Sequence, residues 1–186
     1  SNRISANVSG ALGTMRISMT DNLLTRCSPG AVRAVLGHEM GHYVLNHIYK
    51  FVLQFALVIT AGLGFCAWAF ERVVARKGAA WGIGSVADPA GLPLISLLVG
   101  AFMFVATPVT NSIIRTQDVE ADQFGLNAAR EPDGFADAAL MLSEYRKMKP
   151  GKWEEIVFYD HPSGYNRILM AMRWKAENTG TGVPSR

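Results

Sequence analysis

The sequence has few charged residues and few cysteines, and both shortages exclude classes of function. Charged residues make up 18% of the 186 residues, and the formal net charge is only +3. No basic block interleaved with aromatic residues occurs, so we expect no nucleic-acid partner. The two cysteines, Cys27 and Cys66, stand far apart and lack a CxxC spacing, which argues against a disulfide framework and a cysteine metal site.

Apolar residues, by contrast, make up 49% of the chain and gather in two long stretches. Residues 51–70 and residues 92–114 contain no charged residue. About 20 residues of helix span the roughly 30 Å hydrocarbon core of a bilayer, so each stretch is long enough to cross it. The alternative is a pair of buried core helices in a soluble protein. We favour membrane helices, because a domain of this size has little protein with which to cover both.

The remaining segments predict a mainly α-helical chain with a small N-terminal β-hairpin. Residues 1–26 alternate around a glycine-containing loop at residues 10–13, which is typical of a hairpin. Ser28 followed by Pro29 predicts a helix start, and apolar residues at helical spacing extend this helix to about Ile48.

The second half of the chain predicts further helices. A connector rich in glycine and alanine, residues 71–91, separates the two apolar stretches. From residue 115 onward the pattern is helical, with interruptions at residues 131–134 and 149–151, where proline and glycine occur together.

The chemical motif of the chain is His38-Glu39-Met40-Gly41-His42. Two histidines four residues apart lie on one face of a helix, where both imidazoles can bind one Zn²⁺. Glu39 beside them can take a proton from the water that such a metal activates. This is the HExxH arrangement, and it predicts a zinc metallopeptidase with one Zn²⁺ per chain. His47, five residues past His42, points away from the ligand face on a continuous helix, so we expect a surface or packing residue there.

A catalytic zinc needs a third protein ligand, and the acidic cluster of residues 118–122 is its expected source. If both apolar stretches cross a membrane, the chain returns to the side that it left. His42 and the acidic cluster then share one side of the membrane.

The ordered combination of segments resembles the M48 metallopeptidases, the family of the Ste24-type CAAX prenyl proteases and the HtpX-like membrane peptidases. The resemblance rests on "ANVSG…MRISMTDNLL", "SPGAVRAVLGHEMGHYVLNH", "RTQDVEADQFGLNA" and "DHPSGYNRI", with two intervening apolar helices. It implies a gluzincin-like HExxH core interrupted by a transmembrane helical hairpin. In that core His38 and His42 bind zinc, Glu39 is the general base, and an acid on a later helix completes the site.

The acidic segment departs from the family pattern, which has Glu-x-x-x-Asp. Alignment on Ala121-Asp122 puts Asp118, one methylene shorter than glutamate, at the ligand position. Glu120 has the usual chemistry but lies about 200° round the helix from Asp122. We therefore favour Asp118 as third ligand, keep Glu120 as the alternative, and assign Asp122 to holding a ligand histidine from behind.

The resemblance also assigns residues outside the metal site. His161 matches a family histidine that helps to polarise the scissile carbonyl or to hold the oxyanion, and Arg167 matches an arginine that braces the site. The strand around Asn7 resembles the family's substrate-binding strand, which pairs with an extended peptide through main-chain hydrogen bonds. The alternative for this strand is a hairpin that only covers the core.

We expect residues 1–186 to form one peptidase domain with three parts. These are the hairpin and HExxH helix (1–50), two membrane helices with their connector (51–114), and the third-ligand and C-terminal helices (115–186). The chain begins with Ser1 inside a predicted strand, so we expect a fragment of a longer membrane protein. The expected location is a bacterial inner membrane, with the active site on the cytoplasmic side. Membrane lipid is an expected partner of the protein.

The sequence thus predicts a membrane zinc metalloendopeptidase that cleaves peptide or protein substrates. Whether the substrate is a lipidated C-terminal peptide or a misfolded membrane protein stays open. The alternative function is that of a non-catalytic, degenerate M48-like membrane protein that acts in binding or assembly. The aspartate at the ligand position supports this alternative, and the intact Glu39 opposes it.

Overall fold

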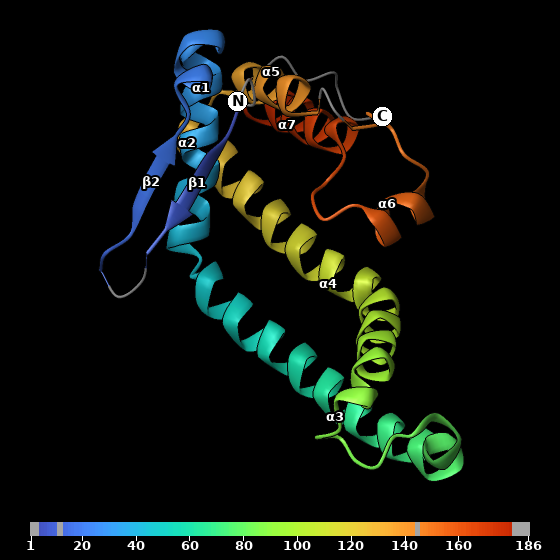
Figure 1. Cartoon of the computed structure of the whole chain (residues 1–186). Coiled ribbons are helices and arrows are strands. Elements are labelled where there is room, and N and C mark those ends of the chain that lie inside the picture. Colours follow the sequence, from blue (N-terminus) through green and yellow to red (C-terminus); the bar gives the residue numbers. More distant parts are fainter. Residues whose placement is uncertain (1–3, 11–12, 144–145, 180–186) are drawn as a thin grey trace. The chain divides into compact units, whose positions relative to one another are not determined.

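The computed structural model describes residues 4–10, 13–143 and 146–179, and the structural statements below concern these residues. They form a mainly helical chain with a two-stranded N-terminal hairpin, as the sequence predicts (Figure 1). The elements are, in chain order, β1 (Ala6–Ser9), β2 (Arg16–Met19), α1 (Asp21–Arg26), α2 (Pro29–Val44), α3 (His47–Trp81), the 3-10 turn η1 (Pro89–Gly91), α4 (Leu92–Ala129), α5 (Pro132–Leu142), α6 (Lys152–Phe158) and α7 (Gly164–Asn178).

The chain divides into two compact units, which we describe separately. The main unit combines residues 1–50 with residues 111–186, and the hairpin unit comprises residues 51–110. The N-terminal hairpin belongs to the main unit, where β1 and β2 pair antiparallel with Asn7 opposite Ser18. Of the predicted hairpin, residues 1–3 and loop residues 11–12 lie outside the described residues.

The hairpin ends earlier than the sequence pattern predicts. Residues 21–26, which we expected to belong to it, form helix α1 instead. Leu23 on this helix is fully buried in a core cluster with Ala31, Val35 and Ala138. Burial of such a side chain contributes about 1.5–3 kcal/mol, and a helical turn presents Leu23 to this core.

Helix α2 begins where the sequence predicts and ends earlier. The Ser28 hydroxyl accepts a hydrogen bond from the Ala31 amide at 3.2 Å, and Pro29 occupies the first helical position, which confirms the predicted cap. The expected end at Ile48 is wrong. Asn46 adopts a left-handed backbone with φ 56°, which asparagine tolerates better than most residues, and this residue separates α2 from α3.

Helix α4 is longer than expected and joins two predicted segments. The second apolar stretch and the acidic cluster at residues 118–122 lie on this one continuous helix, so no boundary exists at residue 115. Helix α3 likewise continues to Trp81, so residues 71–81 of the expected connector are helical. The predicted interruption at residues 131–134 is shorter than expected, because α5 already begins at Pro132, whereas residues 149–151 do separate α5 from α6.

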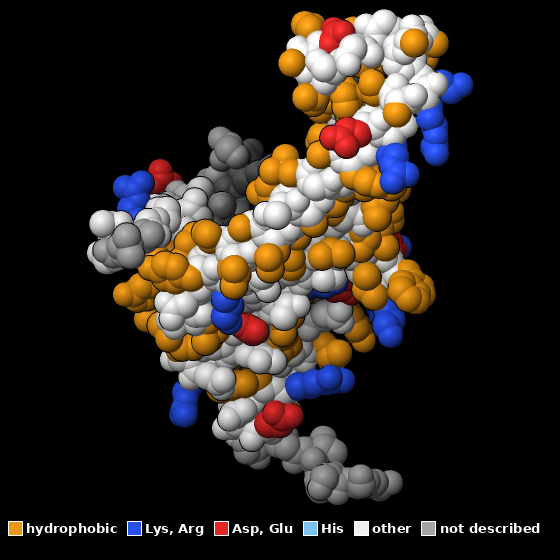
Figure 2. Space-filling model, turned by 90° about the horizontal axis from the view of Figure 1, so that it is seen from below, with side chains coloured by type: hydrophobic (Ala, Val, Ile, Leu, Met, Phe, Trp, Pro, Cys, Tyr) orange, Lys and Arg blue, Asp and Glu red, His pale blue; other side chains and the backbone are white. Residues whose placement is uncertain are grey.

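The hairpin unit exposes most of its apolar surface. Two helices, His47–Trp81 and Pro89–Ala129, are long and apolar enough to cross a membrane. Only 6% and 11% of their most apolar windows are buried, so neither is a core helix of the described chain. Figure 2 shows hydrophobic side chains spread over much of the surface that it presents. Within this unit Phe70, Ile83 and Leu94 form a small buried cluster.

In the main unit, helix α2 packs on α5, and α5 on α7. Helix α2 also meets α4 at very short range through small residues. A Cβ atom on Gly41 would lie 2.9 Å from the Cα of Ala121, and one on Gly37 would lie 3.1 Å from the Cα of Gly125. Because the two backbones touch, the side chains that flank these glycines on α2 and α4 are brought together.

The contact between α2 and α4 predicts a large effect of one added methyl group. In Gly125→Ala the new Cβ would lie 2.8 Å from the backbone nitrogen of His38, which cannot move away as a flexible side chain can. Such overpacking costs about 1–3 kcal/mol. We expect a lower thermal unfolding midpoint for this variant in detergent. Gly100→Ala, on the same helix with nothing within 4 Å, is the control and should not lower it. A midpoint of Gly125→Ala equal to that of the control would contradict the packing argument.

Candidate metal centre

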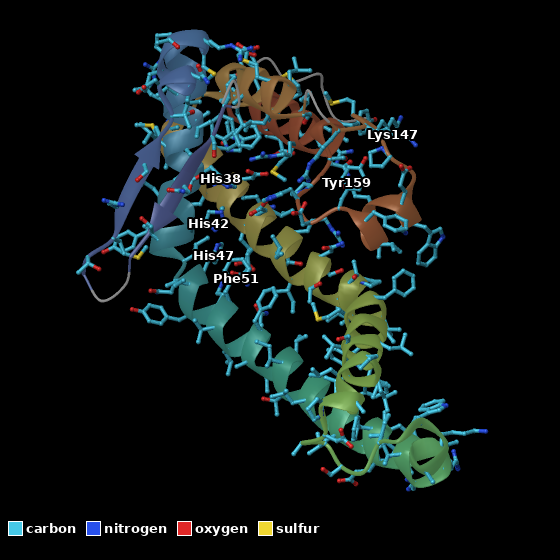
Figure 3. The ribbon with its side chains drawn as sticks, in the orientation of Figure 1. His38, His42, His47, Phe51, Lys147 and Tyr159 are labelled. Carbon is cyan, nitrogen blue, oxygen red and sulfur yellow. The ribbon has the colours of Figure 1, made fainter. Side chains whose placement is uncertain are left out.

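The two histidines of the motif lie on the same side of α2. Their Nε2 atoms are 3.1 Å apart. Figure 3 shows His38 and His42 one after the other along the side of α2 that faces α4. The four-residue spacing of the motif on an uninterrupted helix produces this arrangement.

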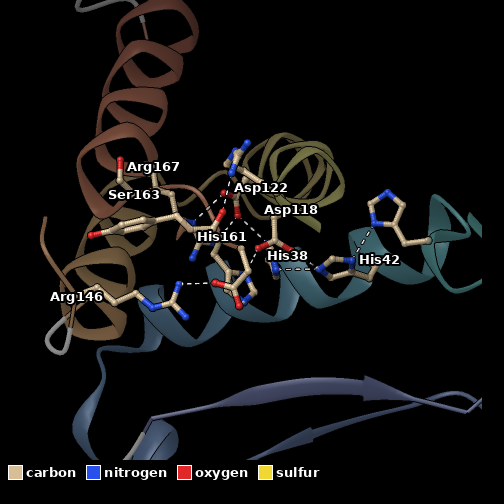
Figure 4. Close-up of polar contacts among 12 residues, drawn as sticks. His38, His42, Asp118, Asp122, Arg146, His161, Ser163 and Arg167 are labelled. Atoms are coloured by element: carbon tan, nitrogen blue, oxygen red, sulfur yellow. Dashed lines mark hydrogen bonds and ion pairs between the residues drawn. The ribbon is translucent and has the colours of Figure 1, made fainter. Parts of the chain in front are cut away.

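Asp118 of α4 joins the two histidines. Its Oδ1 atom is 3.5 Å from the Nε2 of His42, and one ligand atom from each of the three residues lies within 4.8 Å of the others. Burial alone would raise the pKa of the Asp118 carboxyl, but its hydrogen bonds with His161 and His42 outweigh burial and hold the pKa below the usual range. The cluster therefore presents a carboxylate and two imidazoles to one point (Figure 4).

The three residues fit a tetrahedral divalent metal in chemistry and spacing. Bond lengths of about 2.0–2.2 Å from zinc to imidazole nitrogen or carboxylate oxygen separate neighbouring ligand atoms by about 3.3–3.6 Å in a tetrahedron. The 3.5 Å between His42 and Asp118 lies in that range, the 3.1 Å between the two histidines lies just below it, and the third pair of ligand atoms lies within 4.8 Å. Three protein ligands would leave one position open, as catalytic zinc sites require.

Glu120, the alternative third ligand, lies elsewhere. Its Oε2 atom accepts a hydrogen bond from Lys50 at 2.7 Å and lies 3.1 Å from the Nε2 of His47. It is not part of the three-residue group. The structure thus brings Asp118, and not Glu120, next to His38 and His42.

Asp122 lies behind His38, where the sequence predicts a residue that holds a ligand histidine. Its carboxylate is fully buried and its Oδ1 atom is 2.7 Å from the Nδ1 of His38. Arg167 of α7 donates to both oxygens of this carboxylate, with a distance of 2.9 Å from Nε to Oδ2. Burial alone would raise the pKa of Asp122, but the charge of Arg167 and the contact with His38 lower it. Arg167 thus acts on His38 through Asp122, and its guanidinium stacks over the ring of Phe135.

His161 lies in the loop between α6 and α7, and its ring contacts Asp118. The Nδ1 atom of His161 is hydrogen-bonded to Oδ2 of Asp118, the oxygen that does not face His42. This hydrogen bond raises the pKa of His161 above its usual value, despite partial burial. The imidazolium form, which donates from both nitrogens, is favoured as a result.

A cavity of about 460 Å³ opens beside the cluster. Glu39, which is buried, lines it together with His38, Asp118 and His161. Its apolar wall comes from α2 and α5, through Ala34, Val35, Phe135, Ala138 and Ala139. The cavity is large enough for an apolar side chain of a peptide, and Glu39 borders it.

The N-terminal strand reaches this cavity only at its beginning. Ile4, Ser5 and Ala6 line the cavity, whereas Asn7 is exposed and does not. Within the described residues β1 pairs with β2 alone, so its other edge has no strand partner.

His47 is the residue of the site that sequence reasoning missed. It is 1% exposed, and its Nδ1 atom lies 2.8 Å from the Nδ1 of His42. The expectation that it points away from the ligand face is wrong, because it assumed an unbroken helix. The turn at Leu45 and Asn46 shifts the phase between α2 and α3. Asn46, a residue that often ends helices, was the available signal.

Two histidines and a glutamate in HExxH spacing, with an acid from a later helix and an adjoining cavity, form an arrangement typical of metallopeptidases. Comparison with known proteins agrees with this class. Residues 1–175 match the model of peptidase family M48, and the chain belongs to that family.

The chain is also similar to several known proteins. It is 30% identical over 174 residues to the uncharacterized metalloprotease YhfN of Bacillus subtilis (strain 168), covering 91% of this chain and 40% of that protein. It is 25% identical over 171 residues to a CAAX prenyl protease 1 homolog of Oryza sativa subsp. japonica, covering 90% of this chain and 40% of that protein. The chain therefore spans about two fifths of the length of these relatives.

A solved structure shares the fold. The crystal structure of S. mikatae Ste24p matches with a TM-score of 0.67 and 21% identity, over 90% of this chain and 42% of that one. The fold class expected from the sequence, a mainly helical chain with a small hairpin and two candidate membrane helices, is thereby confirmed.

Proposed function

We propose that this chain is the catalytic part of a zinc-dependent membrane metalloendopeptidase. The observation that carries the proposal is the convergence of His38, His42 and Asp118 beside a cavity lined by Glu39. Their donor atoms and spacing fit one Zn²⁺ per chain. A zinc ion bound there would lower the pKa of water and polarise the scissile carbonyl.

In the proposed reaction Glu39 moves the proton. As general base it accepts a proton from the attacking water, and it then passes this proton to the amine that leaves. Its buried position beside the cavity suits a general base, because the carboxylate must lie within hydrogen-bonding reach of the water. The peptide bond is thus hydrolysed without a covalent intermediate on the protein.

We assign His161 and Arg167 to charge stabilisation and positioning. His161 borders the cavity, and its hydrogen bond with Asp118 favours the protonated ring. Such a ring can donate to the oxyanion that develops on the carbonyl oxygen. Arg167 holds Asp122, and Asp122 in turn holds the ring of His38 in the orientation that directs Nε2 to the metal.

We propose that residues 1–186 form one peptidase domain, interrupted by a hairpin that crosses the membrane. Two long apolar helices with little buried surface support an integral membrane protein in contact with lipid. The proposed location is a bacterial inner membrane, with the site on the cytoplasmic side. The domain would be part of a longer protein, since its relatives are more than twice as long.

The proposed substrate is a peptide or protein that binds in extended form along β1. The unpaired edge of this strand offers main-chain hydrogen bonds near Asn7, and its beginning lines the cavity. Two relatives are CAAX prenyl protease homologs, which favours a lipidated C-terminal peptide over a misfolded membrane protein.

Metal analysis and peptide cleavage together test the proposal. We expect the protein, purified in detergent, to carry about one zinc ion per chain and to cleave a fluorogenic peptide. A chelator should abolish cleavage, and added zinc should restore it. A protein that binds no zinc would refute the proposal. One that binds zinc but cleaves neither a prenylated peptide nor an unfolded membrane protein would favour the non-catalytic alternative.

A further inference from the structure

Behind His42 lies a chain of polar contacts made by residues outside the three-residue metal cluster. His47 Nδ1 is 2.8 Å from His42 Nδ1, and His47 Nε2 is 3.1 Å from Glu120 Oε2. Lys50 donates to the same oxygen of Glu120 at 2.7 Å. His47 is 1% exposed, so its two ring nitrogens are satisfied by these partners rather than by bulk water. Figure 3 shows His47 next to His42, on the side of α3 that faces α4.

The arrangement parallels the one behind His38. There Nδ1 of the imidazole meets the carboxylate of Asp122, which the cation Arg167 holds in place. Behind His42, Nδ1 meets His47, which in turn meets the carboxylate of Glu120. The cation Lys50 anchors that carboxylate. Each of the two candidate histidine ligands is thus supported from behind by a series of groups that ends in a carboxylate–cation pair.

The hydrogen-bonding capacity of the groups fixes where the protons lie. The carboxylate of Glu120 only accepts, so Nε2 of His47 donates to it. In a neutral ring Nδ1 of His47 then accepts, and the partner that donates is Nδ1 of His42. This leaves the lone pair of His42 on Nε2, the atom that faces His38 and Asp118.

We infer that His47 is a positioning residue of the metal centre, which holds His42 in the tautomer and orientation that bind the metal through Nε2. Glu120 and Lys50 fix His47 in turn. The inference rests on the proposed function, because it concerns the same metal. In it Glu120 acts as a positioning residue and not as a metal ligand. The turn at Leu45 and Asn46 is what brings His47 back to His42.

Substitution of His47 tests the inference by metal affinity. His47→Phe keeps a ring of similar shape and removes both nitrogens, while His47→Asn places an acceptor oxygen near the position of Nδ1. We expect the zinc affinity of His47→Phe, measured by competition with a chromophoric chelator, to fall by about 10–100-fold. His47→Asn should recover part of that loss. The absorption spectrum of the Co²⁺-substituted protein should change in His47→Phe, because it reports the geometry of the ligands.

A pair of matched variants covers the case in which His47→Phe does not fold. Glu120→Gln and Glu154→Gln each remove one carboxylate that pairs with a lysine at 2.7 Å, with side chains 41% and 38% exposed. Only Glu120 touches His47, so only Glu120→Gln should weaken zinc binding. Equal zinc affinity and equal Co²⁺ spectra in wild type, Glu120→Gln and Glu154→Gln would overturn the inference and leave the proposed function standing. A wild-type protein that binds no zinc would overturn the proposed function as well.

Discussion

Glu39→Gln is expected to abolish peptide cleavage and to leave the zinc content unchanged. Glutamine has nearly the size and shape of glutamate, so the buried site beside the cavity is retained. The amide cannot accept and release a proton at neutral pH, and general acid–base catalysis of this kind contributes about 10²–10⁴-fold in rate. Glu39 is not one of the three residues whose ligand atoms converge, so the metal should stay.

The measurement is the turnover number of a fluorogenic peptide, with metal analysis of the same preparation. Glu154→Gln is the control, because it makes the same chemical change at a partly exposed residue of α6 whose contacts are with Lys147 and its own helix start. We expect the turnover of the control to equal that of the wild type. If Glu39→Gln keeps appreciable turnover, another group accepts the proton and the assignment of Glu39 is wrong.

Asp118→Ala is expected to remove the metal and activity together. Its carboxylate is one of three converging ligands, and loss of a direct ligand should weaken zinc binding by more than the roughly 10–100-fold typical of a supporting residue. Asp118→Asn should behave similarly, since a neutral amide is a poor zinc ligand. Zinc content after dialysis, together with affinity from chelator competition, measures the effect.

Glu120→Ala is the informative comparison, because the sequence leaves Asp118 and Glu120 as rivals. Glu120 contacts His47 and Lys50, so its loss should lower the zinc affinity only moderately and should leave bound zinc at high zinc concentration. Loss of zinc from Glu120→Ala, with zinc retained by Asp118→Ala, would make Glu120 the third ligand in place of Asp118. Both outcomes are read from metal content and do not depend on finding the natural substrate.

Short-range patterns predicted much of the fold. The cap at Ser28, the helical face of the two motif histidines and the two long apolar helices follow from periodicity, capping chemistry and length, which act within a few turns of helix. The extents of the helices were less predictable. Because the chain continues as a helix from the apolar stretch into residues 118–122, composition changes there while backbone conformation does not.

The positions of site residues were predictable within a single helix and unpredictable across the turn at which one helix ends and the next begins. Rotational phase along a single helix correctly separated Asp118 from Glu120 in space. The same reasoning failed for His47, because one left-handed residue at Asn46 changes the phase of everything that follows. The contact between Arg167 and Asp122 spans 45 residues, and only the family resemblance indicated that Arg167 braces the site.

The unbroken course of α4 fixes the distance along the helix between Asp118 and the charge-free apolar stretch. Asp118 follows the last residue of the charge-free stretch, Ile114, by four positions on the same helix. At 1.5 Å per residue this is about 6 Å along the axis, roughly one turn. If the stretch spans a bilayer and the proposed function holds, the scissile bond is cut at the edge of the hydrocarbon rather than in open solvent. A substrate anchored in the same leaflet would need only a short spacer between its anchor and the bond that is cut.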